Sequence, residues 1–282
     1  MDITRLGIVG SGIMGSGIAE VAAKAGVEVI LRSRQQSSAD AMVSSLERSL
    51  AKQVEKGRLD EAVAKEIGGR VSGTDDLGAL ADCDLVIESV VEDLAVKKAL
   101  FAELDGILKA DAILATNTST LSVTELAVAT SRPDKVVGIH FFNPAPMMKL
   151  VEVIAPLTAT PETVDTAKAF ATACGKDVVE VKDRAGFIVN ALLFPYLNNA
   201  IRMLENGTAN RDDIDTAMKG GCNFPMGPLA LLDLVGLDTS LSILDALYEE
   251  FRDPNYAPQP LLRRMVAAGK LGRKSGSGFY DY

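Results

Sequence analysis

The chain lacks the features that mark disulfide-stabilised, metal-dependent and membrane-spanning proteins. It has only three cysteines, Cys83, Cys174 and Cys222, which are odd in number and too widely spaced for a metal-binding pair. Such a set predicts no disulfide framework and no metal site, and it is typical of a reducing compartment. The sequence also has no run of about 20 apolar residues, so it predicts no membrane-spanning helix.

Positive charge is scarce as well. The chain carries 29 lysines and arginines against 38 aspartates and glutamates, which gives a net charge of −9. A nucleic acid would have to find a local basic patch on such an acidic protein, so we expect no nucleic-acid partner. The N-terminus runs directly into an apolar segment containing glycine, without the basic-then-apolar pattern of a secretory signal. We therefore expect a cytoplasmic protein.

The remaining composition is that of an ordinary globular protein, and its 282 residues suit two domains. Apolar strand patterns alternate with helical patterns up to about residue 184, which predicts a parallel sheet covered by helices on both faces. Beyond that point the sequence shows helical periodicity and no convincing strand. The predicted strands are residues 5–10, 27–31, 84–88, 112–115, 135–140, 150–155 and 177–182. The predicted helices between them are residues 13–25, 40–68 with a break at Gly57, 93–109 and 120–130.

A glycine-rich pattern, G-x-G-x-x-G, occupies residues 10–15 between the first predicted strand and the first predicted helix. There Gly10 permits a tight turn, Gly12 lets the backbone approach a pyrophosphate, and Gly15 lets the helix pack on the strand. The helix N-terminus would supply N–H groups to the anion. The alternative is an ordinary strand–helix turn. We expect cofactor contacts from Gly10, Gly12, Ile13, Met14 and Gly15.

This pattern predicts an α/β fold with two parts. A Rossmann-type dinucleotide-binding domain would span residues 1–184, and an all-α domain would span residues 185–282.

The end of the second strand bears on the choice of cofactor. An NAD-selective site usually has an aspartate or glutamate there to accept from the ribose 2′-hydroxyl, but this chain has Ser33 between Arg32 and Arg34. A small hydroxyl flanked by guanidinium groups suits the 2′-phosphate of NADP. The other interpretation is that both arginines are solvated loop residues. The sequence therefore predicts NADP or NAD, with NADP slightly favoured through Ser33 and Arg34.

The single histidine, His140, ends an apolar strand. A lone histidine beside aromatic residues is commonly a packed residue, yet active sites gather at the C-terminal ends of parallel strands, and histidine titrates near neutral pH. Glu152 is a second anomaly, because a carboxylate within an apolar strand is costly without a partner. A carboxylate bonded to an imidazole fixes its tautomer and stabilises the imidazolium. We therefore predict that His140 and Glu152 form a general acid–base pair.

Four motifs occur in the same order as in the short-chain 3-hydroxyacyl-CoA dehydrogenases. They are the glycine pattern at residues 10–15, Asn-Thr-Ser-Thr at 117–120, His-Phe-Phe-Asn-Pro at 140–144, and Lys-Ser-Gly-Ser-Gly-Phe-Tyr at 274–280. The chain resembles this family from about residue 5 to 282, and within it the bacterial 3-hydroxybutyryl-CoA dehydrogenase subgroup. The resemblance implies a dinucleotide-binding domain and an all-helical domain that dimerises. Ser33 departs from the family pattern, in which most relatives have aspartate.

The resemblance also implies roles for individual residues. His140 would be the catalytic base and Glu152 its supporting carboxylate. Side chains that hold the acyl carbonyl and hydroxyl would be Ser119 and Asn190, with Asn143 beside the histidine. Residues near the nicotinamide and its ribose would be Glu92, Lys97 and Asn117. Residues that contact CoA would be Lys52 and Lys56.

A helical spacing supports the CoA assignment independently. Arg48, Lys52 and Lys56 recur at every fourth residue of one predicted helix, so they share a face and could hold the CoA phosphates. The alternative is an ordinary solvated face.

The expected reaction is the reversible oxidation of an (S)-3-hydroxyacyl-CoA to a 3-oxoacyl-CoA with NAD(P)+. One alternative is a dehydrogenase of a carrier-protein-bound substrate or of a free acid. Related free-acid enzymes use a lysine, which this chain does not have where His140 stands. Another is a non-catalytic, crystallin-like nucleotide-binding relative, which predicts a degraded pair, whereas both His140 and Glu152 are present.

Overall fold

The computed structural model describes residues 2–282, which divide into two compact units. The first ends at Asp183 and the second begins at Arg184. We call them the N-terminal unit and the C-terminal unit and describe each by itself.

The N-terminal unit is built on one eight-stranded sheet with the order β3-β2-β1-β4-β5-β6-β7-β8. Neighbouring strands are parallel except β6 and β7, which are antiparallel. The strands are β1 (Arg5–Val9), β2 (Glu28–Arg32), β3 (Val71–Thr74), β4 (Leu85–Glu88), β5 (Ile113–Thr116), β6 (Val136–Phe141), β7 (Leu150–Ala155) and β8 (Asp177–Lys182).

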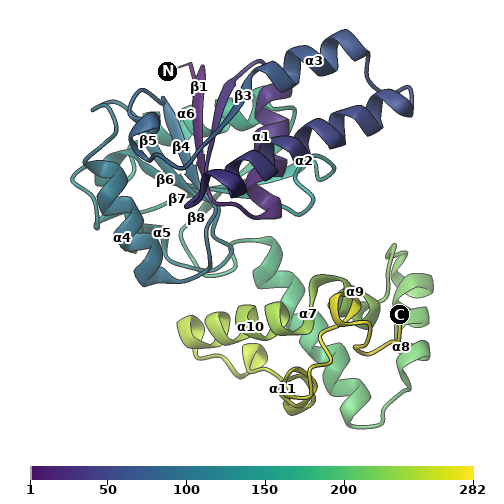
Figure 1. Cartoon of the computed structure of the whole chain (residues 1–282). Helices are drawn as coiled ribbons and strands as arrows, with labels where there is room; N and C mark the ends of the chain where they lie inside the picture. Colours follow the sequence, from purple (N-terminus) through teal and green to yellow (C-terminus); the bar gives the residue numbers. More distant parts are fainter. Residues whose placement is uncertain (1) are drawn as a thin grey trace. The chain divides into compact units, whose positions relative to one another are not determined.

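Helices cover both faces of this sheet. The strands run between α1, α2 and α3 on one side and α4 and α5 on the other (Figure 1). The core under α1, α2 and α6 contains Ile8, Leu31 and Ile87 from the central strands. The helices are α1 (Ile13–Lys24), α2 (Gln36–Glu55), α3 (Glu61–Gly69), α4 (Leu94–Asp105), α5 (Val123–Ala127) and α6 (Pro161–Ala173), with short 3-10 turns at Gly78–Leu80 and Pro133–Lys135.

The central strands are buried on both faces, as helices on both sides of a parallel sheet require. Every residue of β4, β5 and β6 is buried. These strands are accordingly apolar, and Glu88 and His140 are the two residues among them with ionisable side chains. An ionisable group in such a place needs a hydrogen-bonding partner, so both residues point to a constructed polar site.

The sheet differs from the predicted one in two respects. The sheet is otherwise parallel, as predicted, but β7 pairs antiparallel with β6, because residues 142–149 are too few for the crossover that parallel strands need. The prediction also missed β3, a four-residue edge strand of which only Val71 is buried. Its short, mostly polar sequence carries no strand pattern.

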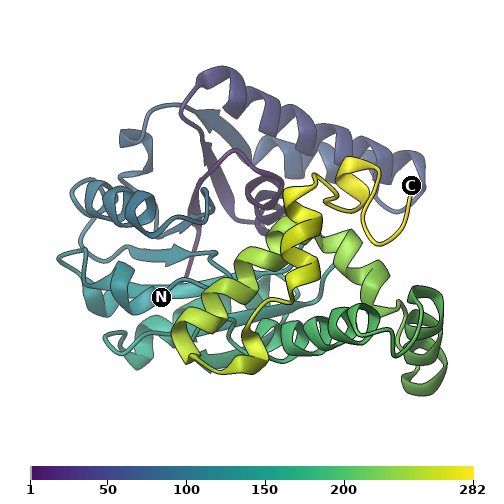
Figure 2. The ribbon, with the colours of Figure 1, turned by 90° about the horizontal axis from the view of Figure 1, so that it is seen from below.

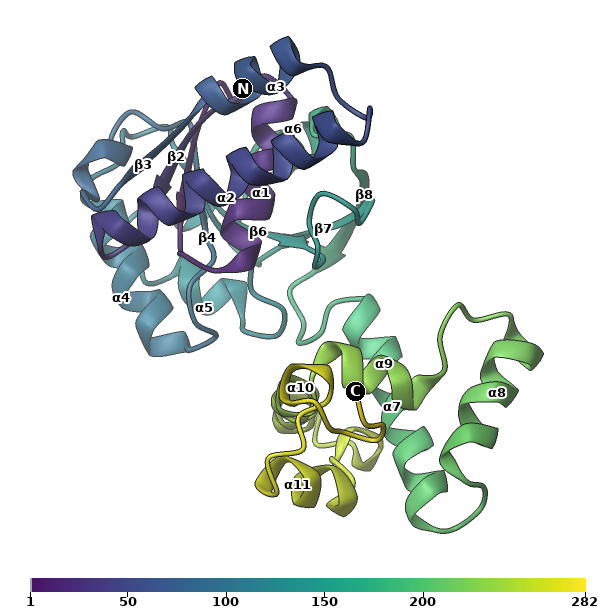
Figure 3. The ribbon, with the colours of Figure 1, turned by 45° about the vertical axis from the view of Figure 1, so that its right-hand side comes forward.

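The predicted helices are present, and their bounds differ from the predicted ones: α1 and α4 are shorter, whereas α2 begins four residues earlier, at Gln36. The break predicted at Gly57 separates α2 from α3, and the two helices contact each other side by side (Figure 3). Asp60 begins α3 by accepting a hydrogen bond from the N–H of Ala62. The segment expected to be helical over residues 120–130 forms only the short helix α5.

The C-terminal unit is helical (Figure 2, green to yellow). Within residues 184–282 it has no β-strand, and only two isolated bridges join Ser277 to Gly272 and to Asp281. Its core contains Leu197, Leu229 and Leu244. The predicted fold class, a Rossmann-type domain followed by an all-α domain, is confirmed. The helices are α7 (Val189–Glu205), α8 (Arg211–Cys222), α9 (Pro228–Val235), α10 (Leu237–Phe251) and α11 (Pro260–Ala267), with 3-10 turns at Pro254–Tyr256 and Arg273–Ser275.

Buried aspartates fasten the chain end to this unit. Asp233 of α9, 1% exposed, accepts from the N–H groups of Phe279 and Tyr280 at 2.9 and 2.8 Å. A Cβ on Gly278 would lie 2.0 Å from an oxygen of Asp233, so this position requires glycine. Asp215 accepts from the Tyr280 hydroxyl at 2.9 Å. Burial and this bond raise the pKa of Tyr280. The motif at residues 274–280 is therefore a structural clasp.

Residues 2–282 offer neither a membrane-spanning helix nor a metal cluster. No helix there is long and apolar enough to cross a membrane. No group of three or more histidine, cysteine, aspartate or glutamate side chains there is placed to hold a metal ion.

Candidate active site

The glycine-rich turn has the geometry of a dinucleotide-binding loop. Gly10 has a φ of +138°, and a Cβ there would lie 2.2 Å from the carbonyl oxygen of Ser89. A Cβ on Gly15 would lie 2.6 Å from the Gly10 oxygen, whereas nothing lies within 4 Å of a Cβ on Gly12. The first two glycines are thus required by packing, and Gly12 leaves space in front of the turn. That space suits the close backbone approach of a pyrophosphate.

The helix that follows can hold an anion. Gly12 caps α1 without a side-chain hydrogen bond, and the first turn contains no acidic residue. Its N–H groups are therefore open to a negatively charged ligand. Ile13 is 78% exposed beside them, and Met14 packs against the core. These residues fit the diphosphate of a dinucleotide.

The end of β2 carries no carboxylate. Ser33 is 5% exposed, and its N–H donates to the Thr74 oxygen at 3.0 Å. Arg32 donates through Nε to the carbonyl of Asp75 at 3.3 Å, and Arg34 is exposed. The two guanidinium groups therefore differ: one is tied to the backbone and the other is free to move.

The antiparallel pairing of β6 and β7 brings together the two residues that are predicted to form an acid–base pair. His140 and Glu152 stand directly opposite each other in the register. His140 Nδ1 lies 2.8 Å from Glu152 Oε2, and Glu152 is 0% exposed. Since an ionised carboxylate can only accept, Nδ1 carries the proton and Nε2 is the basic nitrogen. The tautomer is thus fixed by the sheet.

Ser119 lies on the other side of the imidazole. Its Oγ is 3.0 Å from His140 Nε2, and the Phe142 ring lies 4.5 Å from the imidazole between ring centres. Asn117 accepts from the N–H of Phe141 at 2.8 Å, which ties the end of β5 to β6. The structure therefore brings together Asn117 and Ser119 from the turn after β5, His140 from β6 and Glu152 from β7. Such a relay can move a proton to or from an oxygen held beside Nε2.

A second buried network lies beside the serine. Lys97 Nζ is 2.6 Å from Glu88 Oε1 and 3.3 Å from Glu92 Oε2. Glu92 Oε1 accepts from the N–H of Ser119 at 2.9 Å. Glu92 and Lys97 are predicted site residues, implied by the family resemblance, whereas Glu88 is not among the predicted residues. The signal that identifies Glu152 is also present for Glu88, since both are carboxylates within apolar strands.

Two further predicted residues, Asn143 and Asn190, belong to other segments of the chain. Asn143 is exposed in the loop after β6. Asn190 is 8% exposed on α7 of the C-terminal unit. Its role beside His140 stays a prediction.

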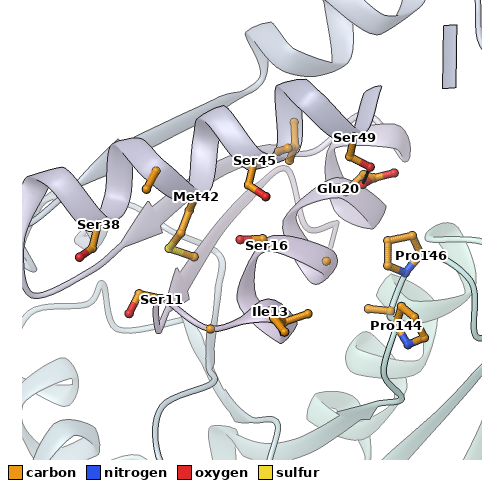
Figure 4. Close-up of a pocket in the computed structure, with 15 residues that line it drawn as sticks. Ser11, Ile13, Ser16, Glu20, Ser38, Met42, Ser45, Ser49, Pro144 and Pro146 are labelled. Carbon is orange, nitrogen blue, oxygen red and sulfur yellow. Dashed lines mark hydrogen bonds between the residues drawn. The ribbon is translucent and has the colours of Figure 1, made fainter. Parts of the chain in front are cut away.

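A cavity of about 490 Å³ lies between α1, α2 and the loop after β6 (Figure 4). Glu20 projects from α1 toward Ser49 of α2, which donates to it at 2.8 Å. Burial opposes ionisation of Glu20, but hydrogen bonds from Lys24, Gln53 and Ser49 outweigh it and lower the pKa of Glu20. Hydroxyl groups on the cavity wall come from Ser11, Ser16, Ser38, Ser45 and Ser49.

A buried lysine holds the loop that forms the third wall. Lys176 is 9% exposed, and its Nζ donates to the carbonyls of Ala145 at 2.6 Å and Met148 at 2.8 Å. Burial lowers the pKa of Lys176. Gly17 of α1 approaches the same loop, because a Cβ there would lie 3.2 Å from the Ala145 Cβ. The loop is therefore fixed against both α1 and the start of β8.

The predicted cationic stripe continues from this cavity. Arg48, Lys52 and Lys56 are exposed, and none of them forms a side-chain hydrogen bond or ion pair within residues 2–282. Lys52 and Lys56 follow Ser45 and Ser49 at spacings of four, three and four residues, which keeps all four on one face of α2 and its last turn. The positive charges of Lys52 and Lys56 therefore lie at the end of a hydroxyl-lined cavity, where they could contact a phosphate.

Comparison with known proteins gives one consistent result. Residues 5–184 match the family described as 3-hydroxyacyl-CoA dehydrogenase, NAD binding domain, and residues 186–282 match its C-terminal domain. A 3-hydroxybutyryl-CoA dehydrogenase of Clostridioides difficile is 49% identical over 99% of both chains. The human mitochondrial hydroxyacyl-coenzyme A dehydrogenase is 43% identical over 99% of this chain and 91% of its own.

A solved structure agrees. The (S)-3-hydroxybutyryl-CoA dehydrogenase of Ralstonia eutropha superposes with a TM-score of 0.97 at 42% identity, covering 100% of this chain and 99% of the other. The resemblance inferred from the motifs is therefore confirmed. The chain belongs to the 3-hydroxyacyl-CoA dehydrogenase family of oxidoreductases.

Proposed function

We propose that this chain catalyses the reversible oxidation of (S)-3-hydroxybutyryl-CoA to acetoacetyl-CoA with a nicotinamide dinucleotide. The observation that carries the proposal is the hydrogen-bonded series Ser119–His140–Glu152. It lies in the same unit as a dinucleotide-binding turn, and full-length relatives are named for this reaction.

The residues of the site divide the work. A nicotinamide dinucleotide held at the glycine turn would supply the acceptor for the hydride that leaves C3 of the substrate. His140 Nε2 takes the proton of the 3-hydroxyl group, and in the reverse direction returns it to the 3-oxo oxygen. Glu152 stabilises the imidazolium through Nδ1. Ser119 holds the oxygen whose charge changes, and Asn190 is proposed as a second donor to it.

For the cofactor, we propose that the chain uses NADPH at least as well as NADH. Ser33 removes the carboxylate that would repel a 2′-phosphate, and the exposed Arg34 is free to pair with one. A charge-assisted pair contributes about 1.5–3 kcal/mol, which is worth about ten- to a hundredfold in preference. Gly10, Gly12, Ile13, Met14, Gly15, Glu92, Lys97 and Asn117 are the other proposed cofactor residues.

For the substrate, the cavity and the cationic stripe support CoA over a free acid. Lys52 and Lys56 would meet its phosphates, and Asn143 lies in the loop that forms one wall. A free 3-hydroxy acid would leave this cavity and both lysines without a partner.

We also propose that the C-terminal unit forms a homodimer in the cytoplasm. Exposed apolar side chains in this unit, including Leu192 at 73% and Leu234 at 50%, support self-association. Three free cysteines support a reducing compartment.

An assay of absorbance at 340 nm with acetoacetyl-CoA tests the reaction and the cofactor together. NADH and NADPH are supplied separately, and His140→Gln serves as the inactive control. We expect oxidation of both cofactors, with NADPH favoured or equal. Activity with neither would overturn the proposal in favour of a non-catalytic nucleotide-binding protein. A tenfold preference for NADH in kcat/KM would overturn the cofactor assignment alone.

A further inference from the structure

A fully buried ion pair lies behind the proposed site, and the proton relay does not use it. Glu88, at the C-terminal end of β4, is 0% exposed, and Lys97 of α4 is 1% exposed. Glu88 Oε1 accepts from Lys97 Nζ and from the N–H of Val90, both at 2.6 Å. Its Oε2 accepts from the Thr116 hydroxyl at 2.8 Å. Both oxygens are thus fixed by donors from three segments of the unit.

The pair extends outward to Glu92. Lys97 Nζ lies 3.3 Å from Glu92 Oε2, so one ammonium group bridges two carboxylates. The side chain of Glu92 is 41% exposed, whereas that of Glu88 is 0% exposed. Glu92 is therefore the member of the network that a bound ligand can reach.

The other oxygen of Glu92 holds the turn that contains Ser119, the residue proposed to bind the substrate. Glu92 Oε1 accepts from the Thr118 hydroxyl at 2.5 Å and from the N–H of Ser119 at 2.9 Å. The hydroxyl of Ser119 in turn lies 3.0 Å from His140 Nε2. One carboxylate thus faces a buried cation on one side and the substrate-binding turn on the other.

We propose that Glu88 is a positioning residue that makes the cofactor and the acyl-CoA bind cooperatively, through Lys97 and Glu92. The inference rests on the proposed function, because it takes Glu92 to contact the cofactor and Ser119 to contact the substrate. A cofactor at Glu92 restrains its carboxylate, and the restrained carboxylate restrains the turn that presents Ser119. By thermodynamic linkage, bound substrate raises the affinity for the cofactor by the same factor by which bound cofactor raises the affinity for the substrate.

Glu88 sets the strength of this coupling because it balances the charge of Lys97. With Glu88 neutral, the buried ammonium has Glu92 as its remaining carboxylate. A buried cation that loses its partner attracts the nearest anion more strongly. Glu92 then turns toward Lys97, releases the N–H of Ser119, and no longer transmits cofactor binding to the serine.

Binding without turnover provides the test. Acetoacetyl-CoA and the oxidised cofactor form a ternary complex that cannot react, since both are oxidised. Calorimetry gives the Kd of acetoacetyl-CoA alone and with saturating NADP+ or NAD+, whichever the assay favours. The ratio of the two constants is the coupling factor. We expect a factor between about 5 and 150 for the natural chain, and a factor within twofold of 1 for Glu88→Gln.

Asp84→Asn is the matched control. Asp84 stands just before β4 and pairs with Lys109 at 2.6 Å, so it is a similar ion pair at the opposite end of the same strand. This variant should lose stability yet keep the natural coupling factor. If Glu88 had a purely structural role, Glu88→Gln would also lose stability but would keep the coupling factor of the natural chain.

Two outcomes would overturn the inference: no coupling in the natural chain, or an unchanged factor in Glu88→Gln. If Glu88→Gln does not fold, Thr116→Val decides, because it removes one donor to Glu88 and no charge. Its factor should fall at least twofold, and an unchanged factor overturns the inference. Failure of the reaction would be seen separately, as cooperative binding without oxidation of NADPH or NADH.

Discussion

Both units bury carboxylates, but the partners of these carboxylates differ in kind. In the N-terminal unit, Glu152 is fully buried against the imidazole of His140. In the C-terminal unit, Asp233 is as deeply buried, but its oxygens accept from the backbone N–H groups of Phe279 and Tyr280. The first partner is an imidazole, which can exchange a proton with a bound substrate, whereas the second consists of backbone amides, which cannot.

The same contrast holds for a second pair of residues. Glu88 contacts the ammonium of Lys97, whereas Asp215 accepts from the N–H groups of Leu229 and Ala230 at the start of α9 and from the uncharged hydroxyl of Tyr280. Backbone partners fix a carboxylate in place and stabilise the fold. Side-chain partners that carry charge let a carboxylate respond to a proton or a ligand. The comparison predicts that substitution of Glu152 or Glu88 changes activity or ligand binding, and that substitution of Asp233 changes stability.

The largest effect should follow loss of the histidine. His140→Gln should lower kcat by about 10²–10⁴-fold, the usual contribution of a positioned acid–base group. The Kd of the cofactor should change by less than twofold, because His140 faces the substrate. Steady-state kinetics and calorimetry measure the two quantities. A variant that keeps a tenth of the natural kcat would contradict the assignment.

The partner carboxylate should act as one unit with the histidine. Glu152→Gln keeps the shape but loses the charge that stabilises imidazolium, so we expect kcat to fall by at least tenfold. Residues that work together are strongly non-additive. The double variant with His140→Gln should therefore be no slower than His140→Gln alone. If the kcat loss of the double variant equalled the product of the two single losses, the residues would act independently.

In the clasp of the C-terminal unit, a substitution should change stability and leave activity unchanged. Asp233→Asn replaces one of two acceptor oxygens with a donor, which should lower the free energy of unfolding by about 1–3 kcal/mol. The kcat of the folded protein should not change. Urea unfolding followed by circular dichroism measures the first quantity, with the exposed Asp281→Asn as control. A loss of kcat without a loss of stability would break the comparison.

The smallest effect should come from the exposed lysines. Lys52→Glu with Lys56→Glu should raise KM for acetoacetyl-CoA by roughly tenfold, the effect of losing charge-assisted contacts of about 1.5 kcal/mol. KM for the N-acetylcysteamine thioester, which lacks the phosphates, should stay the same. Equal changes for both substrates would point to damage to α2.

The glycine turn and the contact between His140 and Glu152 could be predicted from the sequence, because each depends on a local pattern or on a polar residue in an apolar strand. The antiparallel pairing of β6 and β7 that creates this contact could not be predicted. An alternation of strands and helices predicts parallel neighbours throughout, and only the short segment 142–149 betrays the reversal at β7. Glu88 carries the same signal as Glu152, a carboxylate in an apolar strand, but its partner Lys97 could not be predicted because it comes from a separate helix.

Lys97 itself was predicted to contact the cofactor, and the structure adds a buried partner for it. Burial of this kind depends on how α4 packs on the sheet. No local pattern encodes it, since an exposed and a buried lysine on a helix have the same spacing.

The hairpin of β6 and β7 also determines which changes in length the chain tolerates. His140 and Glu152 are only 12 residues apart, so their contact closes a short loop and needs little chain entropy to form. Side chains alternate between the faces of a strand, so one residue inserted into β7 before Glu152 would turn its carboxylate away from the imidazole. A residue inserted into the loop 142–149 leaves that alternation intact. Variation in length among functional descendants of this chain should therefore gather in the loop and spare both strands.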